Sequence, residues 1–280
     1  MTPDPDRPEA APSESELPEQ PRFDVREFAR TARGSHRASP AIAGLAGEEV
    51  PAEAVHLIRV LRDLERGTME RMRNLLVTAA HKDGRVTAFL TTWAFEKFWL
   101  ADALDAVLES LGEEAQGPNP DLSPRRSRRE RAERRGPIAR TVIGSIRGAP
   151  LIAAHAATGL VDELIGQAAY RRLGLIHDRL AHLAQLAIEV KDRHVRFFAE
   201  EAQRRLALGE RPRRLARTEL AQAAWPLGAI GRPAADRSFF ETVVFGDEQG
   251  RAEARSIADR LAALPGLAPV APVVAARLAP

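Results

Sequence analysis

The chain of 280 residues contains no cysteine. Disulfides, iron–sulfur clusters, thiolate zinc sites and cysteine nucleophiles are therefore excluded, and any metal must be bound by carboxylates and imidazoles. Lysine is nearly absent too, because the 41 lysine and arginine residues are all arginine apart from Lys82, Lys97 and Lys191. This arginine bias, together with abundant alanine, is typical of a GC-rich bacterial genome and indicates no particular function.

Long apolar runs and a secretion signal are also lacking. No apolar segment approaches the roughly 20 residues that span a bilayer. Residues 1–21 are acidic and rich in proline, whereas a signal peptide begins with basic residues and continues with an apolar core. We therefore expect a cytoplasmic protein with no membrane contact, in which residues 1–50 form a largely disordered N-terminal segment.

Three motifs of common enzyme families are absent. The chain has no Walker loop for nucleotide phosphates, no G-x-S-x-G of a hydrolase and no His-Glu-x-x-His of a zinc protease. The sequence therefore names no substrate, and its function must be sought in the polar residues that its helices carry.

Apolar residues at helical spacing predict four long helices. We expect them at about 53–80, 86–111, 151–173 and 178–208. Short links make each successive pair antiparallel, whereas the stretch 112–150 is long enough to return the chain to the other end of the molecule. The fold class is therefore all-α, with an antiparallel four-helix bundle over 51–210 and one long crossover. Weaker helical patterns over 211–280 predict a C-terminal extension packed on the bundle.

One ionisable residue interrupts the apolar stripe of each predicted helix. These residues are Glu65, Glu96, Glu163 and His194. Glu65, for example, lies about two turns from both Ile58 and Met72 and so shares their face. A buried carboxylate costs several kcal/mol unless it is paired or bound to metal. The pattern therefore predicts that the four side chains meet in one central layer and compensate one another.

Three segments resemble helices two, three and four of the ferritin-like di-metal carboxylate proteins. They read TTWAFEKFWLADAL, GLVDELIGQAAYRRL and IEVKDRHVRFFAEEA. That family places a Glu, a Glu-x-x-His pair, another Glu and a second Glu-x-x-His pair on its four helices. The positions that match are Glu65, Glu96, Glu163 and His194. The resemblance covers roughly Glu53 to Leu208, and it implies iron or manganese as the metal and oxygen as co-substrate.

Two positions depart from the family pattern. Trp99 stands three residues after Glu96, where the family has histidine, and Lys191 stands three residues before His194, where the family has glutamate. An indole does not bind a metal, and an ammonium group repels one. We therefore predict an incomplete, metal-free carboxylate site, in which Lys191 pairs with Glu96 or Glu163 and supplies the missing positive charge.

These departures favour a binding or structural protein. The alternative is a ferritin-like iron- or manganese-dependent oxidoreductase, with Glu65, Glu96, Glu163 and His194 holding one ion. A second alternative is a nucleic-acid-associated protein, because Arg125 to Arg135 in the crossover contains seven arginines and two glutamates. Such a run binds phosphate without reading bases, and its glutamates favour a solvated segment. The sequence leaves a homodimer open.

Overall fold

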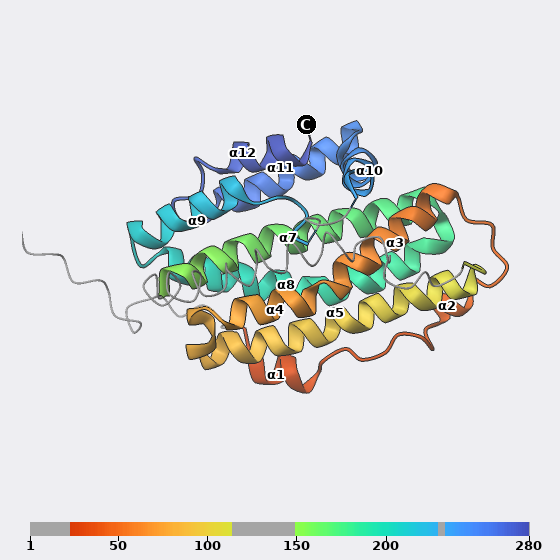
Figure 1. Ribbon diagram of the computed structural model, residues 1–280, viewed down its shortest axis with the longest axis horizontal. Helices are drawn as coiled ribbons and strands as arrows, with labels where there is room; N and C mark the ends of the chain where they lie inside the picture. Colours follow the sequence, from red (N-terminus) through yellow and green to blue (C-terminus); the bar gives the residue numbers. More distant parts are fainter. Residues whose placement is uncertain (1–22, 114–148, 229–232, 280) are drawn as a thin grey trace, which may run out of the picture.

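The computed structural model describes residues 23–113, 149–228 and 233–279, and within these ranges it is helical with no β-strand. Four long helical segments lie side by side along the long axis of the molecule (Figure 1). They are α3 (Ala52–Arg66) continued by α4 (Thr68–Leu76), α5 (Gly84–Ser110), α7 (Ala149–Ile176) and α8 (Ala181–Leu206). The prediction of an all-α chain is confirmed for the described ranges.

The long helices pack against one another in a ring. α3 contacts α5 and α7, and α8 contacts the same two helices. α5 and α7 run in one direction along the long axis, whereas α3 and α8 run in the other (Figure 1). The space that these helices enclose contains the hydrophobic core, with fully buried side chains such as Leu61, Phe89, Ile165 and Phe197.

The ends of the long helices differ in detail from those predicted. The first predicted helix is divided at Gly67, which ends α3 and precedes α4, and glycine is a poor helix former. Asp83 begins α5 by accepting a hydrogen bond from the N–H of Val86 (3.0 Å). Short 3₁₀ turns, η2 (Ala79–Lys82) and η4 (Asp178–Leu180), precede α5 and α8.

The segment before α3 packs on the long helices. It contains α1 (Val25–Arg30) and α2 (Pro40–Ala43), which lie against α5 and, for α2, also α8. Phe28 and Leu45 are buried. We expected residues 1–50 to be largely disordered, but the acidic, proline-rich composition that led to this expectation does not extend past residue 22, and the residues that follow supply aromatic and aliphatic anchors. Residues 1–22 lie outside the described ranges.

The C-terminal part adds more helix than expected. α9 (Glu210–Gln222), α10 (Ala234–Phe245) and α11 (Glu248–Ala262) contact α7, and α12 (Ala271–Leu278) packs on α9 and α11. Gly209 separates α8 from α9 with φ of 136°, a backbone conformation that other residues rarely adopt. The apolar residues 239–245 form most of α10, where Phe240, Val243 and Val244 are buried.

The two remaining sequence predictions concern the crossover and contact with a membrane. The crossover between α5 and α7, including Arg125 to Arg135, lies almost entirely in residues 114–148, outside those ranges. Among the residues that are described, no helix combines the length and the apolar character needed to cross a membrane.

Candidate functional site

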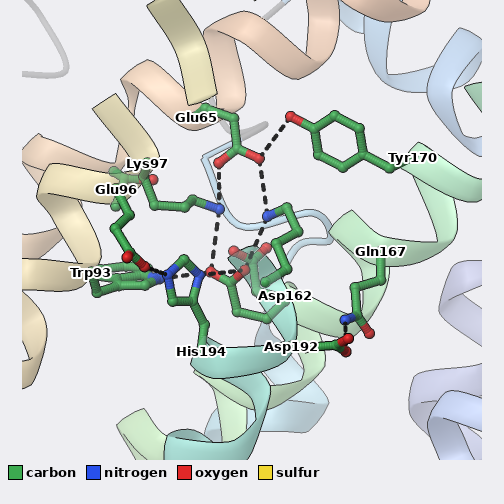
Figure 2. A network of polar contacts seen from close by, with 12 residues as sticks. Glu65, Trp93, Glu96, Lys97, Asp162, Gln167, Tyr170, Asp192 and His194 are labelled. Atoms are coloured by element: carbon green, nitrogen blue, oxygen red, sulfur yellow. Dashed lines mark hydrogen bonds and ion pairs between the residues drawn. The ribbon is translucent and has the colours of Figure 1, made fainter. Parts of the chain in front are cut away.

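The four residues singled out from the helix stripes meet between the long helices (Figure 2). Glu65 comes from α3, Glu96 from α5, Glu163 from α7 and His194 from α8, and each is at most 2% exposed. His194 Nε2 lies 2.8 Å from Glu96 Oε2, and His194 Nδ1 lies 3.5 Å from Glu163 Oε2. The expected convergence in one buried layer is therefore present.

Two lysine side chains lie in the middle of this layer. Lys191 Nζ is 2.9 Å from Glu65 Oε1 and 3.0 Å from Glu163 Oε2. Lys97 Nζ is 3.2 Å from Glu163 Oε1 and also pairs with Glu65 Oε2. Each carboxylate therefore bridges both ammonium groups, with one oxygen atom directed at each. The predicted pairing of Lys191 with Glu163 is observed, and Glu65, instead of Glu96, is its second partner.

Aromatic side chains complete the surroundings of the two ammonium groups. Trp93 Nε1 donates to Glu163 Oε1 (2.8 Å), and the Tyr170 hydroxyl donates to Glu65 Oε1 (3.3 Å). The same rings lie close to the cations, because Lys97 Nζ is 6.0 Å from the Trp93 ring centroid and Lys191 Nζ is 5.7 Å from that of Tyr170. These distances permit weak cation–π attraction in addition to the ion pairs.

Glu96 belongs to a second part of the layer, which faces the N-terminal segment. Its Oε1 atom accepts a hydrogen bond from the backbone N–H of Arg33 (2.7 Å) and lies 3.1 Å from Arg193 Nη1. Arg193 also donates to Thr31 O (2.9 Å). Glu96 and Arg193 therefore fasten the segment after α1 over the layer, and His194 connects this part to Glu163.

A third group closes the layer on the side of the C-terminal extension. Arg71 Nη1 donates to Asp162 Oδ2 (2.5 Å) and to Leu227 O (3.2 Å). The N–H of Leu227 donates to Asp162 Oδ1 (2.7 Å). A cavity of about 20 Å³, with room for about one water molecule, lies between this group and the two lysines. The chain after α9 thus covers the layer, and this small cavity lies beside the lysines within the described ranges.

The charged groups of the layer balance one another. The carboxylates are Glu65, Glu96, Asp162 and Glu163, and the cations are Lys97, Lys191, Arg71 and Arg193. Leaving the imidazole of His194 aside, the formal charges sum to zero. Burial of so many charges is tolerable only because each has a partner of opposite sign.

The pKa values follow from the competition between burial and these partners. Burial alone would raise the pKa of Glu163, but Lys191 and Lys97 hold it well below its ordinary value, and they lower that of Glu65 in the same way. Burial alone would lower the pKa of Lys191, but Glu163 and Glu65 raise it above its ordinary value. For Lys97, burial prevails and lowers the pKa. Lys191 is therefore the more firmly charged of the two ammonium groups.

The layer does not fit a metal ion of the ferritin-like kind. All four oxygen atoms of Glu65 and Glu163 already face an ammonium group, and a protonated amine has no lone pair to offer a metal. The ring of Trp99 contacts that of Phe98, a half-exposed residue of α5 (5.1 Å between centroids). Among the described residues, no group of three or more His, Asp or Glu side chains is arranged to hold a metal.

Lys97 was not predicted to belong to the layer, although its position in the sequence indicates burial. Lys97 lies four residues after Trp93, so the two side chains share a face of α5, and Trp93 is buried. Two of the chain's lysines thus fall on buried helix faces. Lysine is almost never fully buried unless it is paired. This combination predicts a paired internal cation.

Gly166 provides the space that Lys191 occupies. A Cβ atom at this position of α7 would lie 2.7 Å from Lys191 Nζ and 2.9 Å from its Cε. We expect Gly166→Ala to displace the ammonium group from its carboxylates and to lower the free energy of unfolding by about 1–3 kcal/mol, the usual cost of overpacking a core. Urea denaturation measures the change.

The control for this substitution is Gly84→Ala. A Cβ atom there meets nothing within 4 Å, and the residue begins α5. Alanine should leave that variant as stable as the wild type or slightly more stable, since it favours a helix. Equal stability of the two alanine variants would show that Lys191 does not depend on the space at Gly166.

Comparison with protein-family models, with curated proteins and with solved structures finds no match to this chain. The inference about function therefore depends on the geometry of the buried layer and on the resemblance of its helices to the ferritin-like pattern.

Proposed function

We propose that the chain is a ferritin-like four-helix bundle in which Lys97 and Lys191 take the place of metal ions, and that it acts as a binding or structural protein. The observation that carries this proposal is the position of the two ammonium groups. Each lies between Glu65 and Glu163, inside the layer where a ferritin-like protein would bind its metal. The reaction of a metal-dependent oxidoreductase has no support in this donor set.

The course of the helices supports the ferritin-like part of the proposal. α3, continued by α4, is antiparallel to α5, and the short stretch 77–83 joins α4 to α5; α7 and α8 are likewise antiparallel and joined by a short link (Figure 1). α5 and α7 are parallel, with a long stretch of chain between them. Ferritin-like bundles have this connectivity of one long crossover between two antiparallel pairs. The polar residues that matched the family pattern come from the four corresponding helices.

The layer can perform a structural role without any ligand. Its ion pairs connect α3, α5, α7 and α8 at one level, and Glu96 and Asp162 extend the connections to the segment after α1 and to Leu227. A buried network of this kind fixes the register of neighbouring helices, because any shift leaves a buried charge without its partner. The bundle would thereby fold in one arrangement without a supply of metal.

The proposal predicts the metal content of the wild-type protein. Protein purified without chelators, from cells grown with added iron and manganese, should contain well below one metal ion per chain, because the lysines repel a further cation. Plasma mass spectrometry measures the content, and oxygen uptake after addition of Fe²⁺ should equal that of buffer alone. Iron or manganese at one ion per chain would overturn the proposal and favour the oxidoreductase.

Two expectations about partners stay predictions. Phe95 and Phe98 are 44% and 50% exposed on the outer face of α5. A homodimer that buries these two side chains stays a proposal. Binding of nucleic acid depends on Arg125 to Arg135, which lie outside the described ranges, so its support comes from the sequence alone.

A further inference from the structure

We propose that the surface of α5 and α8 beneath residues 23–45 (the strap) is a peptide-docking site, which takes the strap of a second copy of this chain when the chain's own strap leaves. This inference goes beyond the proposed function, because it names a binding site and a partner. It does not depend on Lys97 or Lys191, so either proposal can fail without the other.

The first support is that side chains of the long helices bind the main chain of the strap. The N–H of Phe23 donates to Glu200 Oε2 (2.5 Å), and Arg85 Nη1 donates to Phe23 O (3.2 Å). Arg193 Nη2 donates to Phe28 O (3.0 Å). Peptide-binding domains commonly use such bonds to the main chain for affinity and contacts with side chains for specificity.

The second support is the aromatic contact between the strap and the long helices. The ring of Phe28 is stacked on that of Phe89 of α5 (5.2 Å between centroids) and meets that of His194 of α8 edge-on (6.0 Å). The ring of Phe23 meets those of Phe89 and Phe197 edge-on (6.0 and 5.5 Å). Buried aromatic anchors of this kind supply much of the binding energy of protein contacts. We therefore expect the surface to select a segment with two aromatic side chains five residues apart.

The third support is that the strap can leave without breaking the connections of the bundle. α1 has six residues and α2 has four, too few for helices that are stable away from a partner. Residues 46–51 join the strap to α3 and run around one end of the molecule (Figure 1). Among them Ala46, Gly47, Glu49 and Pro51 are exposed. The chain from α3 to α8 does not pass through the strap, so the long helices stay joined when the strap leaves.

The partner is a second copy, because each copy carries both the docking surface and a strap that fits it. Exchange of straps between two copies restores in each the contacts that the structure shows within one chain, which is a low-cost route to a dimer. Exchange also completes the buried layer. Glu96 is fully buried and accepts from the N–H of Arg33 (2.7 Å), so it loses a partner when the strap leaves and regains one from Arg33 of the partner subunit.

The first test uses full-length chains and a fluorescent peptide with the sequence of the strap. Asp24 is exposed and caps α1 by accepting two N–H bonds of its first turn (2.9 and 3.0 Å). Asp24→Ala therefore weakens the chain's own strap, and it should raise the affinity for the peptide about fivefold over that of the wild type. The control Asp247→Ala removes a cap of the same kind from α11 and should bind the peptide as the wild type does. A peptide with Phe28→Ala should bind at least about tenfold more weakly.

The second test measures association of the wild-type chain by analytical ultracentrifugation. A short link keeps a chain's own strap at a local concentration in the millimolar range, so two copies should exchange straps at about that concentration of protein. We expect dimers there, and we expect an excess of the peptide to convert them to monomers. Phe95→Ser with Phe98→Ser alters the exposed aromatic patch of α5 and should leave these dimers unchanged.

Four results decide against the inference. A folded Asp24→Ala variant that binds no more peptide than Asp247→Ala shows that the surface does not accept a strap in trans. An Asp24→Ala variant that loses its helices by circular dichroism shows that the strap is an inseparable part of the fold. A chain that stays monomeric at millimolar concentration has no second copy as its partner. Dimers that persist with excess peptide, or that vanish in the Phe95→Ser, Phe98→Ser variant, use another surface. None of these results bears on the proposed function, which fails instead if the wild-type protein contains stoichiometric metal.

Discussion

Replacing Lys191 by alanine should lower the free energy of unfolding by about 3–5 kcal/mol, the usual cost of removing one partner from a buried ion pair. Lys191 Nζ contacts Glu65 Oε1 at 2.9 Å and Glu163 Oε2 at 3.0 Å, and the side chain is 1% exposed. Without it, two buried carboxylates share the single ammonium group of Lys97. Urea denaturation followed by circular dichroism measures the loss.

Two comparisons separate the lost charge from the lost volume. Lys191→Met keeps much of the side-chain bulk, so it should recover only the part of the loss that comes from packing. Lys82→Ala removes an exposed lysine and should change stability by no more than about 0.5 kcal/mol. If Lys191→Ala melts within a degree or two of the wild type, the layer does not depend on the ammonium group, and the structural role proposed for it fails.

The sequence was sufficient to find the layer because its residues interrupt apolar helix stripes. Glu65, Glu96, Glu163 and His194 each stand where the helical period requires a buried side chain, and burial forces polar groups to meet. The period also located the long helices to within a few residues. It could not show the division at Gly67, since the apolar pattern continues across it and only the backbone at the glycine changes.

The sequence could not predict which charged residues of the layer pair with one another. Lys191 was expected to pair with Glu96 or Glu163, and the choice depends on how far α5 and α7 are rotated about their axes, which a helical pattern does not fix. In the structure Glu96 turns to Arg193 and to the N–H of Arg33. The segment that carries Arg33 was expected to be disordered, so its contribution to the layer had no sequence signal.

The contribution of Lys97 escaped notice for a related physical reason. α5 is apolar on nearly all sides, because it is covered by α3, α8 and the N-terminal helices. Its neighbours Glu96 and Lys97 are therefore both buried, although they point in directions about 100° apart on the helix. A single apolar stripe of the helix therefore contains one of them and not the other. The two residues serve different parts of the layer, Glu96 at His194 and Lys97 at Glu163.

Glu163→Gln should be as damaging as the loss of Lys191, again by about 3–5 kcal/mol, because it removes the negative charge that both lysines share. Glu163 Oε1 accepts from Trp93 and Lys97, and its Oε2 atom faces Lys191. Glutamine has nearly the same shape, but its amide nitrogen must point at one of the ammonium groups. The layer then holds one positive charge too many. Chemical denaturation at neutral pH measures the cost.

A second substitution should repair part of this damage. Lys97→Met in the Glu163→Gln background removes the surplus charge and leaves Glu65 paired with Lys191. Lys191 Nζ lies 2.9 Å from Glu65 Oε1. Lys97 is the better residue to remove, because burial already lowers its pKa, whereas that of Lys191 is raised. The double variant should therefore be more stable than Glu163→Gln alone, with a coupling of about 0.5–3 kcal/mol between the two sites. Lys82→Met in the same background should give no rescue, since Lys82 is exposed. Equal stability of Glu163→Gln with and without Lys97→Met would mean that shape, and not the balance of charge, holds the layer together.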